Sequence, residues 1–138
     1  NGDIQYSAKN NPTFISLLVS RFSFFQTINY LKKYLNINQN KFKNYRKELI
    51  EAPFLSGCFL TFPSELYFKI GGFSKKYFLH FEDADIVRRC NEEGLTIHCP
   101  YGQITHVRGR GSHKSLSQQI HLLNSYIKYS QIWGFKLF

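Results

Sequence analysis

The apolar run at residues 54–62, FLSGCFLTF, constrains the fold of this chain more than any other segment. Its aromatic and β-favouring residues predict a strand, and Gly57 stands in the middle of that strand. Glycine weakens a strand interior unless another backbone or a ligand comes close, so we expect such an approach at Gly57. Pro63 suits the first position of a short helix over residues 63–69, which Gly71 and Gly72 would end.

Helices and short strands alternate around this run, and the alternation predicts an α/β fold. The longer helices are expected at residues 11–35, 82–93 and 116–133, and further short strands within 1–8, at 95–99 and at 104–107. Residues 36–51 are polar and mostly basic without a clean period, which predicts a long surface connection. We expect one partial domain with three parts: a helical and basic connecting region (1–52), a core (53–115) and an amphipathic C-terminal helix (116–138).

The composition says more about the partners of the chain than about its fold. The chain has 138 residues, of which 43% are hydrophobic and 20% charged, so one domain with a core can form. Eighteen Lys and Arg against nine Asp and Glu give a net charge of +9, which suits nucleic acid, acidic lipid headgroups or a phosphorylated substrate. The absence of methionine and the start at Asn1 indicate a piece of a longer protein, whose preceding segment would hold part of the active site.

Cysteine spacing and hydropathy indicate where the protein works. The three cysteines show no C-x-x-C spacing, which argues against a disulfide framework and for a reducing compartment. No segment reaches the roughly 18 uninterrupted apolar residues of a spanning helix. We therefore expect a cytoplasmic protein that, if it meets a membrane, lies against it.

The segment FEDADIVRRCNEEG places three carboxylates in the first turn of a predicted helix, where the helix dipole favours negative charge. Asp83 shares the inward stripe with Val87, whereas Asp85 falls on the opposite face and can pair with Arg89 at the surface. An inward carboxylate beside aromatic residues is partly desolvated and becomes a better proton acceptor, so Asp83 is the candidate general base. The alternative is purely structural, because acidic residues prefer helix starts. The D-x-D spelled by Asp83 and Asp85 is read as a coincidence, because the two side chains point about 160° apart on a helix.

A glycine-rich basic loop, VRGRGSHK, follows the last predicted strand. Arg108 and Arg110 could approach phosphate oxygens there, which predicts a diphosphate site with His106 as a metal ligand. A solvated basic loop explains the same residues equally well. A zinc site built from His106 with His98, Cys90 and Cys99 is disfavoured, because the paired close spacings of structural zinc sites are missing.

The last predicted helix carries two apolar stripes that together cover half of its circumference. One is aliphatic (Leu116, Ile120, Leu123, Ile127) and the other aromatic (Tyr126, Tyr129, Trp133), and both lie opposite Ser117, His121, Ser125 and Lys128. Packing against the domain is the expected role. A Tyr and Trp stripe near lysines also suits a membrane interface.

The order of these segments resembles the C-terminal half of family 2 glycosyltransferases, especially the rhamnosyltransferase-like enzymes that build bacterial O-antigen and related surface polysaccharides. In that family a strand with a small-residue glycine motif leads to a short helix and a G-G-F-D-E turn. An aromatic stretch, E-D-x-D-L-x-x-R, a G-x-x-I strand, a proline and a strand ending in His follow. The resemblance covers residues 53–112, and NGDIQYSAKNNPT is similar to the N-D-G-x-x-x-x-S-x-R-x-x-P-T segment upstream.

The resemblance implies a GT-A fold, with a mixed sheet and flanking helices, and an inverting transfer from a nucleotide sugar. Asp83 matches the base of the E-D motif and Glu82 its neighbour, while His106 matches a histidine that helps to hold the metal or the diphosphate. Gly57 and Cys58 match the segment lining the sugar pocket. The substrate-binding residues that we expect are Gly57, Cys58, Asp85, Arg108 and Arg110. The G-G-F-D-E turn reads G-G-F-S-K here, so two carboxylates are lost.

We therefore expect the acceptor-side half of a membrane-peripheral glycosyltransferase on the cytoplasmic face of the inner membrane. Its partners would be a nucleotide-sugar donor, a lipid-linked glycan acceptor and an anionic membrane surface, but not nucleic acid. The cofactor would be Mg²⁺ or Mn²⁺, with the main D-x-D ligand upstream of Asn1, so that these residues alone are inactive. The alternative is a non-catalytic basic module that binds nucleic acid or anionic lipid.

Overall fold

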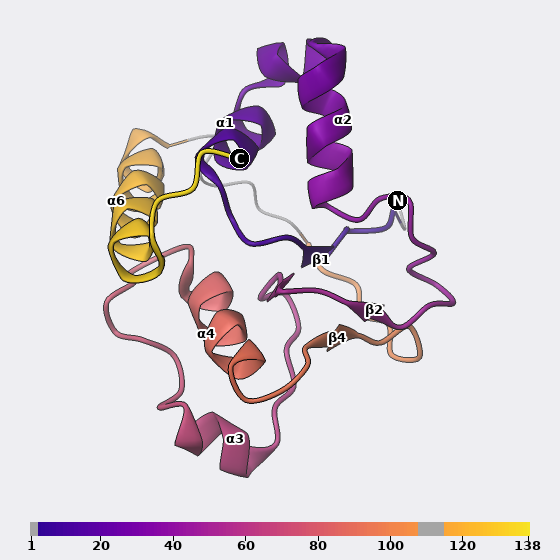
Figure 1. Cartoon of the computed structure of the whole chain (residues 1–138), viewed down its shortest axis with the longest axis vertical. Coiled ribbons are helices and arrows are strands. Elements are labelled where there is room, and N and C mark those ends of the chain that lie inside the picture. Colours follow the sequence, from indigo (N-terminus) through magenta and orange to yellow (C-terminus); the bar gives the residue numbers. More distant parts are fainter. Residues whose placement is uncertain (1–2, 108–114) are drawn as a thin grey trace.

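The computed structural model describes residues 3–107 and 115–138 and combines helices with two small antiparallel sheets (Figure 1). The helices are α1 (Phe14–Arg21), the 3-10 helix η1 (Ser23–Thr27), α2 (Asn29–Asn38), α3 (Ser64–Lys69), α4 (Glu82–Asn91) and α6 (Leu116–Trp133). The strands are β1 (Ala8–Lys9), β2 (Ile50–Glu51), β3 (Phe54–Leu55) and β4 (Ile97–His98). The expectation of a loosely α/β chain is confirmed. In the described part, no helix is long and apolar enough to cross a bilayer.

The two sheets are separate, and each pairs segments that are far apart in the sequence. β1 pairs with β3 in the register Ala8 with Leu55, and β2 pairs with β4 in the register Ile50 with His98. The strand predicted over residues 54–62 is therefore much shorter than expected. It ends because the Gly57 N–H donates to a side chain of α4 and not to a neighbouring strand. The strand predicted at 104–107 is absent from the described residues, where this segment is exposed.

The single helix predicted over residues 11–35 is wrong, because the chain breaks into a hairpin of α1, η1 and α2. Thr13, and not Asn11, caps α1 through a reciprocal pair of hydrogen bonds with Ser16. The helix ends at Phe22, whose backbone is extended, and the Gln26 side chain donates to the Val19 carbonyl near that end. Folding back in this way lets α1 and α2 bury one face of each helix against the other.

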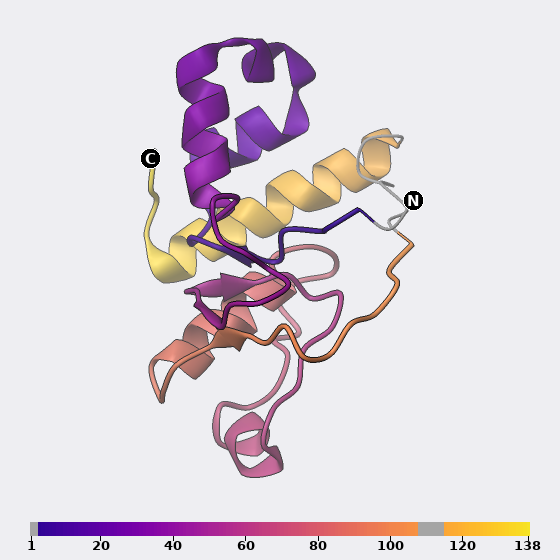
Figure 2. The same ribbon diagram turned by 90° about the vertical axis from the view of Figure 1, so that its right-hand side faces the viewer.

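The main core lies where α4 and α6 meet below the hairpin (Figure 2). It consists of Tyr77, Phe81, Ala84, Tyr126 and Tyr129, with Phe14, Leu17, Phe54, Leu122 and Trp133 packed around it. A smaller cluster at the sheets contains Ala8, Tyr45, Ile50 and Ala52. Within the predicted surface connection, Tyr45 is therefore an anchor: its buried hydroxyl donates to the Ala8 carbonyl at 2.7 Å.

The last helix spans 116–133, as its stripes predicted, and not the whole C-terminal part 116–138. Of its two stripes, only the aromatic one packs. Tyr126 and Tyr129 are buried, and Ser125, which was assigned to the polar face, is buried too and donates to the Leu79 carbonyl. The aliphatic stripe is exposed, at 73% for Leu116, 51% for Ile120, 52% for Leu123 and 47% for Ile127. The aromatic stripe therefore does not form a membrane face.

The five residues after α6 return to the hairpin. The backbone N–H groups of Phe14 and Ile15, in the first turn of α1, donate to the carbonyls of Lys136 and Leu137. The Tyr34 and Phe138 rings meet edge to face 5.8 Å apart. The tail thus satisfies two of the N–H groups that a helix start leaves without a partner in the helix.

Candidate functional site at the start of α4

The start of α4 is held in an unusual backbone conformation. His80 and Phe81, which precede the helix, have φ values of 68° and 66°, in the left-handed region that side chains disfavour. Phe81 is 7% exposed and packs on the rings of Tyr126 and Tyr129 at 5.6 and 5.4 Å. Strain of about 1–3 kcal/mol per residue persists only where packing imposes it, and it is common at functional sites.

Asp83 is partly buried in the first turn of α4 and is fixed by two backbone donors. Its Oδ2 accepts the Gly57 N–H at 2.8 Å, and its Oδ1 accepts the Ala84 N–H at 2.8 Å. A Cβ at Gly57 would stand 3.0 Å from the Asp83 Cβ, which is closer than side chains tolerate without a shift. The sequence predicted that a backbone or a ligand approaches Gly57, whereas the group found there is the side chain of Asp83, the candidate base.

Glu82 and His80 flank this carboxylate, and both carry buried polar atoms. Burial raises the pKa of the Glu82 carboxyl, its own backbone N–H lowers it and the Asp83 charge raises it. Burial lowers the pKa of His80, against the opposing effect of Asp83. Glu82 Oε2 and His80 Nε2 have no hydrogen-bond partner in the described part of the chain. The sequence analysis missed His80, although it lies only three residues before Asp83.

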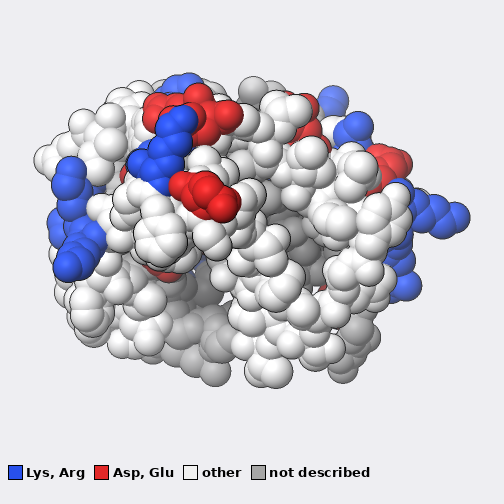
Figure 3. Space-filling model, turned by 90° about the horizontal axis from the view of Figure 1, so that it is seen from below, with Lys and Arg blue, Asp and Glu red and all other residues white. Residues whose placement is uncertain are grey.

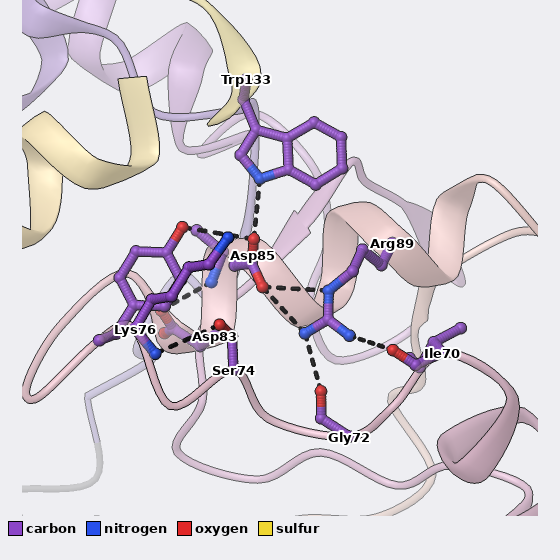
Figure 4. Close-up of polar contacts among 10 residues, drawn as sticks. Ile70, Gly72, Ser74, Lys76, Asp83, Asp85, Arg89 and Trp133 are labelled. Atoms are coloured by element: carbon purple, nitrogen blue, oxygen red, sulfur yellow. Dashed lines mark hydrogen bonds and ion pairs between the residues drawn. The ribbon is translucent and has the colours of Figure 1, made fainter. Parts of the chain in front are cut away.

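Asp85 does not lie where the helical wheel predicted. It is 3% exposed and accepts hydrogen bonds from Trp133 Nε1 at 2.9 Å, from the Tyr77 hydroxyl at 3.3 Å and from Arg89 at 2.8 and 3.0 Å (Figure 4). The pair with Arg89 is confirmed, but it is buried and not at the surface. Both Asp85 oxygens are occupied by protein donors, so Asp85 joins α4 to α6. Its role in substrate binding, which the resemblance implies, conflicts with its burial.

The Arg89 side chain extends this network to the turn after α3. It donates to the Ile70 carbonyl and, at 2.8 Å, to the Gly72 carbonyl (Figure 4). Gly72 has a φ of 62°, and a Cβ there would stand 2.8 Å from the Tyr67 ring, so this position requires glycine. The predicted end of α3 before Gly71 and Gly72 is confirmed. Arg89 holds the turn that reads G-G-F-S-K in this chain.

The other predicted site residues are not brought together with Asp83 by any contact that the structure describes. Cys58 is partly buried, with its Sγ 3.7 Å from the Ser56 carbonyl. His106 is exposed, and its Nδ1 lies 2.9 Å from Gln5 Oε1. Arg108 and Arg110 lie outside the described residues.

The described residues contain no group of three or more His, Cys, Asp or Glu side chains that could hold a metal ion. His98, from the disfavoured zinc set, contacts the Tyr45 carbonyl at 3.0 Å through Nε2, and its Nδ1 lies 3.5 Å from the Ser7 hydroxyl. Within residues 3–107 and 115–138, the side chains present do not make a metal site by themselves.

Comparison with known proteins adds no relative: no family model, curated protein or solved structure is significantly similar to this chain. The functional interpretation therefore depends on the motif order and on the geometry at the start of α4.

Proposed function

We propose that this chain is the acceptor-side part of an inverting glycosyltransferase of the GT-A type, in which Asp83 acts as the general base. The observation that carries the proposal is the fixation of Asp83 at a strained helix start by the Gly57 and Ala84 N–H groups. Two such contacts hold a carboxylate in one orientation, and each oxygen keeps a second lone pair for another donor. An acceptor hydroxyl is such a donor.

The reaction would then proceed in one displacement. As the acceptor oxygen attacks the anomeric carbon, its proton passes to Asp83, the new glycosidic bond forms, and the nucleotide diphosphate leaves with the electron pair of the broken bond. Gly57 and Cys58 would border the sugar, and Glu82 would lie beside the base in its neutral form. The raised pKa of Glu82 favours that form, which limits repulsion between Glu82 and the Asp83 carboxylate.

The donor side is proposed from the resemblance. Arg108, Arg110 and His106 would face the diphosphate, and Mg²⁺ or Mn²⁺ would neutralise the leaving group when it is bound, with its main D-x-D ligand in a segment outside these 138 residues. The donor would be a nucleotide sugar such as one of rhamnose, and the acceptor a lipid-linked glycan of a bacterial surface polysaccharide at the inner membrane. Because the nucleotide-binding half of the family is not part of the resemblance, we expect no turnover by these residues alone.

A transfer assay on the natural protein that carries this chain tests the base. Asp83→Asn keeps an oxygen for one of the two N–H groups, of Gly57 or Ala84, and turns the other acceptor into a donor, so circular dichroism checks that the variant is folded. The loss of a general base lowers kcat by about 10²–10⁴. Glu92→Gln, at the exposed C-cap of the same helix, is the matched control and keeps full activity. Transfer at the wild-type rate by a folded Asp83→Asn variant would exclude Asp83 as the base.

A further inference from the structure

Almost all of the net charge of the protein belongs to one segment. Between Asp3 and Glu48 there is no acidic residue, whereas eight of the 18 Lys and Arg side chains lie there. They are Lys9, Arg21, Lys32, Lys33, Lys41, Lys43, Arg46 and Lys47. The rest of the chain carries ten cations against nine acids and is close to neutral.

This segment contains the hairpin of α1, η1 and α2, which forms one end of the molecule (Figures 1 and 2). The end of the molecule near α3, seen in Figure 3, shows Asp and Glu side chains next to Lys and Arg. In the cationic segment Arg21, Lys32 and Lys33 belong to the hairpin, and Lys41, Lys43, Arg46 and Lys47 to the loop after it.

The turn of the hairpin also leaves large apolar side chains in solvent, as other described segments do. Phe24 is 71% exposed, Tyr30 68%, Phe22 50% and Ile28 43%. They lie within nine residues that contain no charged side chain, and the exposed Lys32 and Lys33 follow on α2. On the helical period Tyr30, Lys33 and Ile37 share one face, so an aromatic ring, a cation and an aliphatic group point the same way.

We propose that the hairpin turn, residues 22–30 with Lys32 and Lys33, is a docking surface for an anionic lipid bilayer. Aromatic and aliphatic groups at the turn enter the headgroup boundary, while the lysines remain at the surface and pair with lipid phosphates. Charge complementarity favours this occupant, because the turn lies in the cationic part of the molecule and has no acidic neighbour in sequence. Binding of the hairpin turn to lipid does not require glycosyl transfer.

Vesicle co-sedimentation of the chain tests the proposal, with phosphatidylcholine vesicles compared with vesicles that also contain phosphatidylglycerol. We expect binding to the mixed vesicles alone, weakened about tenfold by Phe24→Ala through the lost apolar contact. The pair Lys32→Gln and Lys33→Gln weakens it about thirtyfold, since each cation contributes a factor of about five. Phe68→Ala is the control: Phe68 is 79% exposed on α3, at the other end of the molecule, and its loss leaves binding unchanged.

Four results would overturn the proposal. They are equal binding to both vesicle types, an equal loss in Phe24→Ala and Phe68→Ala, a dimer in solution that Phe24→Ala dissociates, and stronger retention by a single-stranded oligonucleotide than by the mixed vesicles. Far-UV circular dichroism verifies that each variant is folded. Vesicle binding by the chain, together with transfer at the wild-type rate by a folded Asp83→Asn variant of the natural protein, would leave this surface in place and remove only the role proposed for Asp83.

Discussion

We predict that loss of the buried Asp85 charge lowers the free energy of unfolding by a measurable amount. Asp85→Asn keeps the shape of the side chain but removes its charge and turns one acceptor oxygen into a donor. Arg89, whose side chain is 21% exposed, then loses its charged partner, and Trp133 or Tyr77 meets an amide N–H instead of a carboxylate. Removing one partner of a buried ion pair costs about 3–5 kcal/mol.

We expect a value near the lower bound, about 3 kcal/mol, because Arg89 keeps the Ile70 and Gly72 carbonyls as acceptors. For a domain of this size that corresponds to a fall in Tm of about 10 °C. Trp133 is the only tryptophan in the chain and donates directly to Asp85, so its fluorescence during urea unfolding reports on the contact itself. Glu92→Gln, at the C-cap of the same helix, serves as the control and should change the free energy of unfolding by less than about 0.5 kcal/mol. A change equally small for Asp85→Asn would refute the view that this network joins α4 to α6.

Two further predictions concern the turn after α3 and the neighbour of the base. Gly72→Ala should destabilise the protein by more than Gly71→Ala, because both residues have positive φ but only Gly72 would drive a Cβ to within 2.8 Å of the Tyr67 ring; equal shifts of Tm would show that the ring moves away freely. Glu82→Gln should stabilise the protein at pH 7 but not at pH 4, because a carboxyl whose pKa is raised on folding contributes its full stability below its usual pKa near 4.5 and loses it as the pH rises. Urea midpoints of wild type and variant at the two pH values measure this, and a constant difference between them would count against burial of Glu82 as the cause.

Local signals in the sequence were sufficient wherever a structural feature depends on neighbouring residues. The bounds of α6 and the end of α3 at Gly71 and Gly72 both follow from short stretches of sequence. The identity of the group at Gly57 was out of reach, because Asp83 is 26 residues away along the chain.

Features that depend on tertiary packing were predicted poorly. The helical wheel assigned Asp85 to the surface on the assumption that α4 has one inward face. In the structure α4 is covered on several sides, with buried side chains at Ala84, Asp85, Ile86, Val87 and Cys90, so no single stripe separates inside from outside. The long helix predicted at 11–35 was wrong for a related reason: its apolar period continues through Phe25 and Ile28, whereas the chain folds back at Phe22, where the backbone is extended.

The return of the C-terminal tail to α1 has a consequence for the order in which the protein is made. Phe14 and Ile15 are synthesised more than 120 residues before Lys136 and Leu137, whose carbonyls accept their N–H groups. A ribosome adds about 5–20 residues per second, so the first turn of α1 waits several seconds for its acceptors. During that interval the hairpin lacks the contacts that the tail provides, and it can be completed only after residue 137 has left the exit tunnel.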